Sequence, residues 1–129
     1  MSDIHGEIHW TELMTRDLDA AKAYYEETCG WSWQVMPMEG GGDYHIATRG
    51  EEMVAGAMDL SGMPEMDDIP AHWFTYLAVD DVDAATARTK EMGGQVMREP
   101  FDIAGVGRIS IVSDPSGAAV GLMTPSNPG

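Results

Sequence analysis

Hydrophobic and polar residues change their spacing within the first thirty positions of the chain. Residues 9–15 alternate between two faces, as expected for a β-strand. From Leu18 onward the apolar positions recur every three or four residues, which is typical of an amphipathic helix. Asp17 is suited to cap the N-terminus of this helix, and Gly30 is suited to end it. The segment therefore predicts a strand followed directly by a helix.

The same pattern recurs 64 positions further along the chain. Residues 73–85 (WFTYLAVDDVDAA) match residues 9–21 (HWTELMTRDLDAA) at six of thirteen aligned positions. The second copy also predicts a strand, a helix capped by Asp81, and an end at Gly93 and Gly94. Because the spacing is close to half of 129 residues, the chain is predicted to contain one structural unit twice.

Shorter alternating segments complete each half. The first half predicts further strands over residues 31–38, 44–49 and 53–59, with a glycine-rich turn at 39–43. The second half predicts strands over 95–98, 107–113 and 118–123, with a turn at 114–117. Each half therefore has the order βαβββ. We expect one domain over residues 1–129, with module one at 5–60, a linker at 61–70 and module two at 71–125.

Composition and charge exclude several classes of partner. The 7 basic and 22 acidic residues give a net charge of −15, which disfavours nucleic acids and anionic membrane surfaces. No apolar run approaches the roughly 20 residues of a membrane span, and the first residues do not resemble a signal peptide. The single cysteine, Cys29, excludes an internal disulfide and suits a reducing compartment. We therefore expect a cytoplasmic protein.

Three motifs in the doubled unit carry a resemblance to a known family. They are D-L-D-A-A-x-x-Y-Y-x-x-x-x-G-W from Asp17, G-G-x-V from Gly93, and D-P-x-G from Asp114. In this order the chain resembles the vicinal-oxygen-chelate superfamily, which includes glyoxalase I, extradiol dioxygenases and bleomycin-resistance proteins. The resemblance implies an α+β fold in which two tandem βαβββ modules form cupped mixed sheets around a cavity. We also expect a homodimer.

The resemblance implies a divalent metal ion held by His, Gln or Glu side chains on the first and last strands of each module. Matching the motifs places these four positions at Trp10, Gly56, Phe74 and Gly121. None of these residues can bind a metal ion through its side chain. Because the first and last strands of a module are neighbours in this family, each aromatic residue is predicted to lie beside a glycine. We therefore expect no metal ion and no other cofactor.

Glu12 is the candidate with the sharpest chemistry, because it shares a strand face with Trp10 and Met14. A carboxylate on the inner face of a small sheet could be a general base or a ligand anchor. It could equally be a structural group that accepts a hydrogen bond from Tyr76 or forms an ion pair with Arg108. Arg108 in turn could hold an anionic ligand or neutralise Glu12. The residues expected to contact a small ligand are Trp10, Glu12, Met14, Tyr44, Met58, Phe74, Tyr76, Arg108 and Met123.

Three functions are compatible with this pattern. The first is a metal-independent, glyoxalase-like protein that binds a small, partly apolar molecule in the cavity between its modules. The second is a lyase or isomerase in which Glu12 is the general acid or base. The third is a divalent-metal enzyme of the glyoxalase or dioxygenase type whose ligands lie at other positions than those assigned above.

Overall fold

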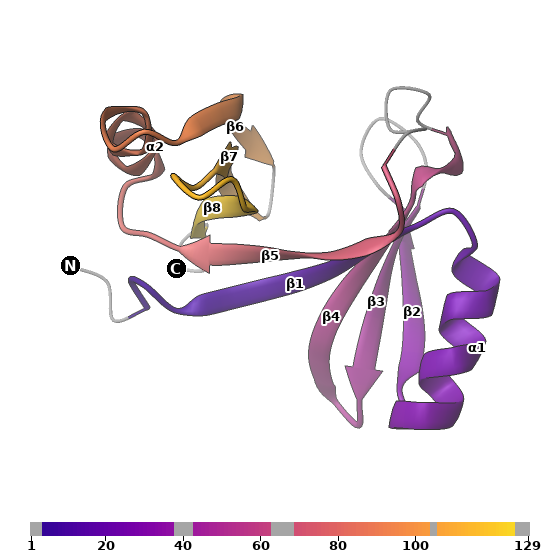
Figure 1. Ribbon diagram of the computed structural model, residues 1–129. Helices are drawn as coiled ribbons and strands as arrows, with labels where there is room; N and C mark the ends of the chain where they lie inside the picture. Colours follow the sequence, from indigo (N-terminus) through magenta and orange to yellow (C-terminus); the bar gives the residue numbers. More distant parts are fainter. Residues whose placement is uncertain (1–3, 38–42, 63–68, 104–105, 126–129) are drawn as a thin grey trace. The chain divides into compact units, whose positions relative to one another are not determined.

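A computed structural model describes residues 4–37, 43–62, 69–103 and 106–125. These residues form two α-helices, eight β-strands and one short 3-10 helix, an α+β fold in the order βαβββ followed by βαβββ (Figure 1). The predicted fold class and element order are therefore confirmed. Most of the predicted glycine-rich turn at 39–43 and most of the predicted linker at 61–70 lie outside the described residues.

The chain divides into two compact units, of which the first spans Trp10–Trp73. Its elements are β1 (Ile8–Thr15), α1 (Leu18–Cys29), β2 (Ser32–Pro37), β3 (Asp43–Arg49), β4 (Glu52–Asp59) and the 3-10 helix η1 (Leu60–Gly62). The strands lie in the order β2-β3-β4-β1, with β1 parallel to β4 and the other pairs antiparallel. The first and last strands of this module are thus neighbours.

The second unit combines Phe74–Gly129 with Met1–His9. Its elements are β5 (His72–Ala78), α2 (Val82–Glu91), β6 (Gln95–Ile103), β7 (Gly107–Ser113) and β8 (Ala119–Pro125). The strands lie in the order β5-β8-β7-β6, with β5 parallel to β8. The N-terminal residues pack with this unit because Gly6 and Glu7 form backbone hydrogen bonds with Ala78.

Both helices begin where the sequence predicts. The Asp17 carboxylate accepts a hydrogen bond from the backbone N–H of Ala20 at 3.1 Å, and Asp81 accepts one from Ala84 at 3.1 Å. The first helix ends at Gly30, whose φ of 71° is in the left-handed region that glycine adopts readily. Among the described residues, no helix is long and apolar enough to cross a membrane.

The helices define an inner and an outer face for the sheet of each unit. In the first unit, Leu13 of β1 and Ala57 of β4 pack against Leu18 of α1. Because successive side chains of a strand point to opposite faces, the neighbours of Leu13 and Ala57 point away from α1. We call this the distal face of the first unit. In the second unit, Val112 and Leu122 pack against the helix, and the side chains between them form the corresponding distal face.

The strand predicted over residues 95–98 is longer than expected. It continues to Ile103 as β6, with register shifts against β7 on both sides of Arg98. Pro100 was expected to interrupt it, but β6 lies at the end of the strand order. A proline is tolerated in an edge strand, where its missing N–H removes no essential hydrogen bond, and the irregular register accommodates it.

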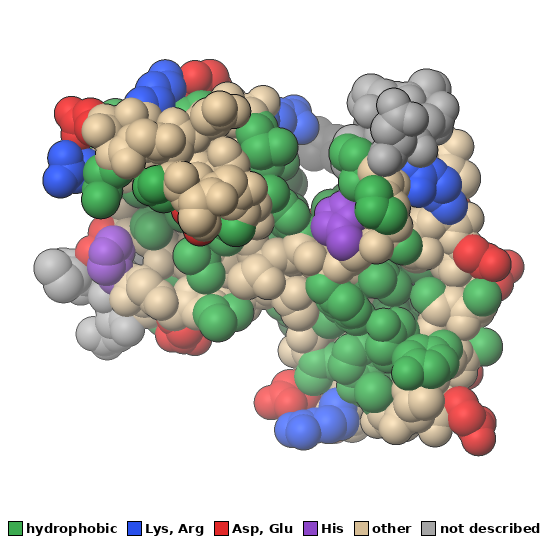
Figure 2. Space-filling view, in the orientation of Figure 1, with side chains coloured by type: hydrophobic (Ala, Val, Ile, Leu, Met, Phe, Trp, Pro, Cys, Tyr) green, Lys and Arg blue, Asp and Glu red, His purple; other side chains and the backbone are tan. Residues whose placement is uncertain are grey.

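Hydrophobic side chains also reach the surface of the units, as Figure 2 shows. In the first unit the most exposed large ones include Val35 and Met36 on β2 and Met53 on β4, each at least half exposed. The position of β2 at the end of the strand order leaves one side of this strand without a neighbour inside its unit.

Candidate functional site

On the distal face of the first unit, two aromatic side chains meet above a glycine. The indole Nε1 of Trp10 donates a hydrogen bond to the hydroxyl of Tyr44 at 2.9 Å. A Cβ atom at Gly56 would overlap the Tyr44 hydroxyl and would lie 3.0 Å from Trp10 Nε1. The predicted pairing of Trp10 with a glycine of the neighbouring strand is therefore confirmed, and Tyr44 completes the group.

Glu12 lies directly beside this group. It is the register partner of Gly56 between β1 and β4, and it is only 4% exposed. Its side chain forms a hydrogen bond with Tyr44. Burial and the negative charge of Glu12 raise the pKa of Tyr44 well above its ordinary range, so the phenol is neutral at physiological pH. The face thus holds a buried carboxylate in contact with a neutral phenol.

Apolar side chains surround these polar groups. Met14 and Met58 are register partners on β1 and β4 and alternate with residues that face α1, which places them on the distal face. Ile46 of β3 is the register partner of Gly56 and is buried. The sequence analysis had included both methionines but not Ile46, although the alternation of β3 carried the signal for it.

The second unit repeats the arrangement with different residues. A Cβ atom at Gly121 would overlap the ring of Tyr76 and would lie 3.1 Å from the ring of Phe74. The two rings are themselves in edge contact, with centroids 5.2 Å apart. Met123, two residues beyond Gly121 on β8, is buried. The predicted pairing of Phe74 with a glycine is also confirmed.

The two units differ at one decisive position of the repeat. Glu12 is the register partner of Gly56, and Tyr76 is the register partner of Gly121, so the two residues are equivalent. In the second unit the ring over the glycine comes from this position. In the first unit the ring comes from Tyr44 on the next strand, and the equivalent position carries a carboxylate. The acidic chemistry is therefore confined to the first unit.

The residues at the metal positions of the family do not fit a metal ion. Indole, phenyl and two glycines offer no side-chain donor. Aromatic rings also fill the space above Gly56 and Gly121, so that even a Cβ atom would not fit there. Within the described residues, no group of three or more His, Cys, Asp or Glu side chains could hold a metal ion.

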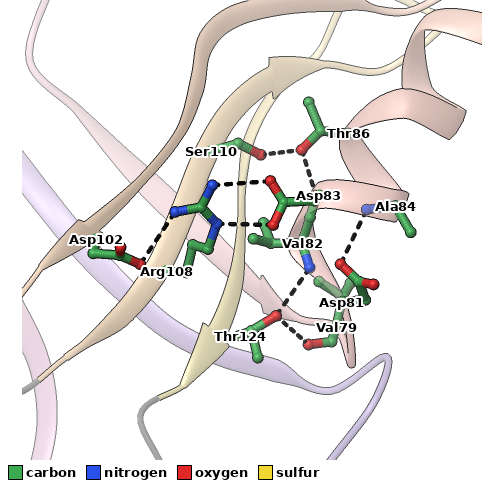
Figure 3. Close-up of polar contacts among 10 residues, drawn as sticks. All are labelled: Val79, Asp81, Val82, Asp83, Ala84, Thr86, Asp102, Arg108, Ser110 and Thr124. Carbon is green, nitrogen blue, oxygen red and sulfur yellow. Dashed lines mark hydrogen bonds and ion pairs between the residues drawn. The ribbon is translucent and has the colours of Figure 1, made fainter.

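Arg108 lies elsewhere than the sequence analysis expected. Its Nε and Nη2 donate to the two carboxylate oxygens of Asp83 on α2 at 2.8 and 3.0 Å, and Nη1 lies 3.3 Å from Asp102 (Figure 3). Arg108 shares a strand face with Val112, which packs against α2. The expected ion pair with Glu12 is therefore wrong, and the side chain lies on the helix side of its sheet, not on the distal face with the aromatic residues.

The hydrogen bonds around Arg108 attach α2 to its sheet (Figure 3). Thr124 accepts a hydrogen bond from the backbone N–H of Val82 and donates one to the carbonyl of Val79. Deeper in the unit, Ser110 and Thr86 form a buried hydroxyl pair at 2.8 Å, and Thr86 donates to the carbonyl of Val82 at 2.6 Å. These contacts are structural, and the sequence analysis did not foresee them.

The predicted hydrogen bond between Glu12 and Tyr76 concerns residues of different units and stays a prediction.

Comparison with known proteins follows the same division between fold and chemistry. The model of the Glyoxalase/Bleomycin resistance protein/Dioxygenase superfamily matches residues 7–122. The chain belongs to this superfamily. The resemblance inferred from the doubled motifs is therefore confirmed, and the tandem βαβββ modules are those of the family.

Relatives and solved structures of this superfamily are similar to the chain over most of its length. The "Putative glyoxylase CFP32" of Mycobacterium tuberculosis is 40% identical over 94% of this chain and 45% of its own length. The anthracycline biosynthesis protein DnrV of Streptomyces peucetius is 32% identical over 85% of this chain and 44% of its own length. The chain thus spans less than half the length of these relatives.

Among solved structures, methylmalonyl-CoA epimerase of Streptomyces coelicolor superposes with a TM-score of 0.68 at 19% identity, covering 97% of this chain and all of that one. The epimerase of Mycobacterium tuberculosis gives a TM-score of 0.65 at 17% identity, covering 98% of this chain and 93% of that one. At this level of identity the likeness concerns the fold alone.

Proposed function

We propose that this glyoxalase-like protein binds a small, partly apolar molecule on the distal faces of its modules, without a metal ion at the family positions. The observation that supports the proposal is the buried Glu12, which is hydrogen bonded to Tyr44 among apolar side chains. Burying a carboxylate is unfavourable, and such groups concentrate at functional sites. The proposed ligand contacts are Trp10, Glu12, Met14, Tyr44 and Met58 in the first unit, and Phe74, Tyr76 and Met123 in the second.

Native mass spectrometry of the purified protein tests the binding proposal. We expect a small molecule that copurifies with the wild-type chain and is lost, or retained far less, in Met14→Glu, which places a charge on the apolar part of the face. The matched control is Met53→Glu, since Met53 is a methionine of the same unit that is 60% exposed. No bound molecule in the wild-type protein, together with no binding from a metabolite extract, would argue against the proposal.

A second candidate is a lyase or isomerase in which Glu12 transfers a proton. The buried position of Glu12 beside a neutral phenol favours this candidate, because such surroundings suit a general acid or base. Methylmalonyl-CoA is a suitable probe, since solved structures of the same fold are epimerases of this compound. Deuterium incorporation from heavy water by the wild-type protein, absent in Glu12→Gln with retained affinity, would support turnover over simple binding.

The third candidate, a divalent-metal enzyme with other ligands, is separated by elemental analysis of the purified protein. Our proposal expects no stoichiometric zinc, nickel, iron or manganese. One equivalent of any of these metals, lost on mutation of a histidine or carboxylate on either distal face, would contradict it.

We also propose that the protein is a cytoplasmic homodimer. Its single cysteine suits a reducing compartment, and the exposed apolar residues Val35 and Met36 on β2 suit contact with a second copy. Light scattering after size exclusion should give twice the mass of 14.0 kDa. Met36→Lys should shift that mass toward one chain, whereas the matched change Met97→Lys on β6 should not.

A further inference from the structure

We propose that Trp10 and Tyr44 are positioning residues that direct the Tyr44 hydroxyl hydrogen to Glu12, so that Glu12 accepts hydrogen bonds from a donor group of the ligand. The part that concerns the ligand rests on the function proposed above. The part that concerns the protein rests on the three side chains alone and can be tested without any ligand.

The direction of the two hydrogen bonds follows from the chemistry of the donors. An indole N–H can only donate, so the 2.9 Å contact makes the Tyr44 oxygen an acceptor from Trp10. A phenol has a single hydrogen, and this hydrogen remains available for the second partner of Tyr44. The second partner is Glu12. The hydrogen bonds therefore run from Trp10 to Tyr44 and from Tyr44 to Glu12.

The electrostatics of Tyr44 have the signs that this direction requires. Donation to Glu12 and the negative charge of Glu12 both raise the pKa of Tyr44, although burial has the largest effect. The hydrogen bond from Trp10 lowers the same pKa. A donor bond stabilises the neutral phenol and an acceptor bond stabilises the phenolate, so Tyr44 donates to Glu12 and accepts from Trp10.

Gly56 holds the three groups in this arrangement. A Cβ atom at this position would overlap the Tyr44 hydroxyl and would also lie against the indole nitrogen of Trp10. The ring of Tyr44 can therefore lie over the backbone of β4 only while residue 56 has no side chain. In the second unit the equivalent glycine, Gly121, is covered by carbon atoms of Tyr76 and Phe74 instead. The ordered hydroxyl is thus a feature of the first unit.

The arrangement selects a chemical class of ligand. An ionised carboxylate is an acceptor only, and a hydrogen bond from Tyr44 leaves several of its lone pairs for other donors. The group that meets Glu12 is therefore an ammonium, N–H or O–H group, and a carboxylate or phosphate is disfavoured by repulsion. Met14 and Met58 on the same face provide apolar contact for the remainder of the molecule.

Carbon-13 NMR titration of the Glu12 carboxyl group tests the positioning role. We expect the pKa of Glu12 to rise in Tyr44→Phe, which removes the donor, and to rise by less in Trp10→Phe, which only weakens it. The matched control is Tyr24→Phe, because Tyr24 is exposed on α1 and should leave the titration unchanged. An identical Glu12 titration in the wild-type protein and in folded Tyr44→Phe would overturn the proposal.

A reciprocal measurement covers the case in which Tyr44→Phe does not fold. In Glu12→Gln the negative charge is lost, so Tyr44 should ionise at lower pH than in the wild-type protein, as followed by its ultraviolet absorbance. An unchanged ionisation of Tyr44 in Glu12→Gln would also overturn the proposal.

Binding of three related probes tests the ligand class. By NMR titration, 2-phenylethylamine should bind at least tenfold more tightly than phenylacetate, with 2-phenylethanol between them, and Glu12→Gln should remove most of this difference. Tighter binding of phenylacetate would overturn the inferred class. If no probe binds while the Glu12 titration behaves as expected, the positioning role stands, and it is the proposed binding function that fails.

Discussion

The hydroxyl of Tyr44 occupies the space where the Cβ atom of residue 56 would otherwise lie. This relationship couples an aromatic residue of β3 to a backbone position of β4. It explains why a glycine stands in the middle of β4, where it would ordinarily weaken the strand. It also places an ordered phenol where relatives with metal ligands would carry a chelating side chain.

Gly56→Ala should destabilise the first unit. The added methyl group would displace Tyr44 and lie against Trp10, which is overpacking of a kind that typically costs about 1–3 kcal/mol. The free energy of unfolding, measured by urea denaturation, should fall by about this amount. The hydrogen bond between Trp10 and Tyr44 should be lost at the same time, which the indole N–H signal of Trp10 would report.

A double-mutant cycle shows whether Tyr44 is the cause. In a Tyr44→Ala background the space above residue 56 is open, so Gly56→Ala should cost less there than in the wild-type protein. An equal loss of stability in both backgrounds would mean that the backbone of β4, and not the ring of Tyr44, requires the glycine.

Gly121→Ala should destabilise the second unit for a similar reason but with a different signature. Its Cβ atom would overlap the ring of Tyr76 and lie close to Phe74. We expect a loss of about 1–3 kcal/mol in unfolding free energy. The Trp10 indole N–H signal should remain in place, because the hydrogen bond to Tyr44 belongs to the first unit. A loss of that signal in folded Gly121→Ala would contradict the assignment.

Much of the fold was predictable because the sequence states it twice. The change from alternation to helical spacing at Asp17 and again at Asp81 fixed both helix starts, and both carboxylates are indeed N-caps. Matching the repeats also placed Trp10 over Gly56 and Phe74 beside Gly121. These features depend on local spacing and on strand neighbours, which a repeated pattern carries well.

The features that were missed depend on which face of a strand meets the helix. In β7, Arg108, Ser110 and Val112 alternate with two isoleucines, so both faces carry apolar residues and the alternation alone does not choose between them. Only the packing of Val112 against α2 shows that Arg108 belongs to the helix side. The extent of β6 was missed because the tolerance for Pro100 depends on the edge position of this strand.

Breaking the buried hydroxyl pair should destabilise the second unit. Ser110 is fully buried and Thr86 is 2% exposed, so neither oxygen can exchange its partner for water. Ser110→Ala or Thr86→Val alone leaves the other hydroxyl with an unmet hydrogen bond and should lower the unfolding free energy by about 1–3 kcal/mol. The double variant should lose less than the sum of the two, since no buried hydroxyl is then left without a partner.

The pair of Asp83 and Arg108 should contribute to stability in a manner that depends on acid. The hydrogen bond from Arg108 holds the pKa of Asp83 below its ordinary value. A carboxylate with a lowered pKa stabilises the folded state above its unfolded pKa of about 3.9, and this contribution is lost as the pH falls through the folded value. Asp83→Asn should therefore flatten the decline of unfolding free energy below about pH 4.

The control for this variant is Glu91→Gln on the same helix. Glu91 pairs with Arg88 in an ion pair whose side chains are both more than half exposed, so the change should alter acid stability less than Asp83→Asn does. Equal effects of the two variants would show that the contact between α2 and β7 has no particular role.

At the alkaline end, Tyr44 should decide part of the pH dependence. Its pKa is raised, chiefly by burial and then by the charge of Glu12, whereas an unfolded tyrosine titrates near pH 10. Below about pH 10 the phenol is neutral in both states. Above it the unfolded chain ionises while folded Tyr44 does not, so the free energy of unfolding falls as the pH rises. Tyr44→Phe removes this contribution, and urea denaturation between about pH 9 and pH 11 should show a shallower decline than in the wild-type protein or in Tyr24→Phe. A decline equally steep in Tyr44→Phe would mean that Tyr44 is not buried against Glu12 in solution.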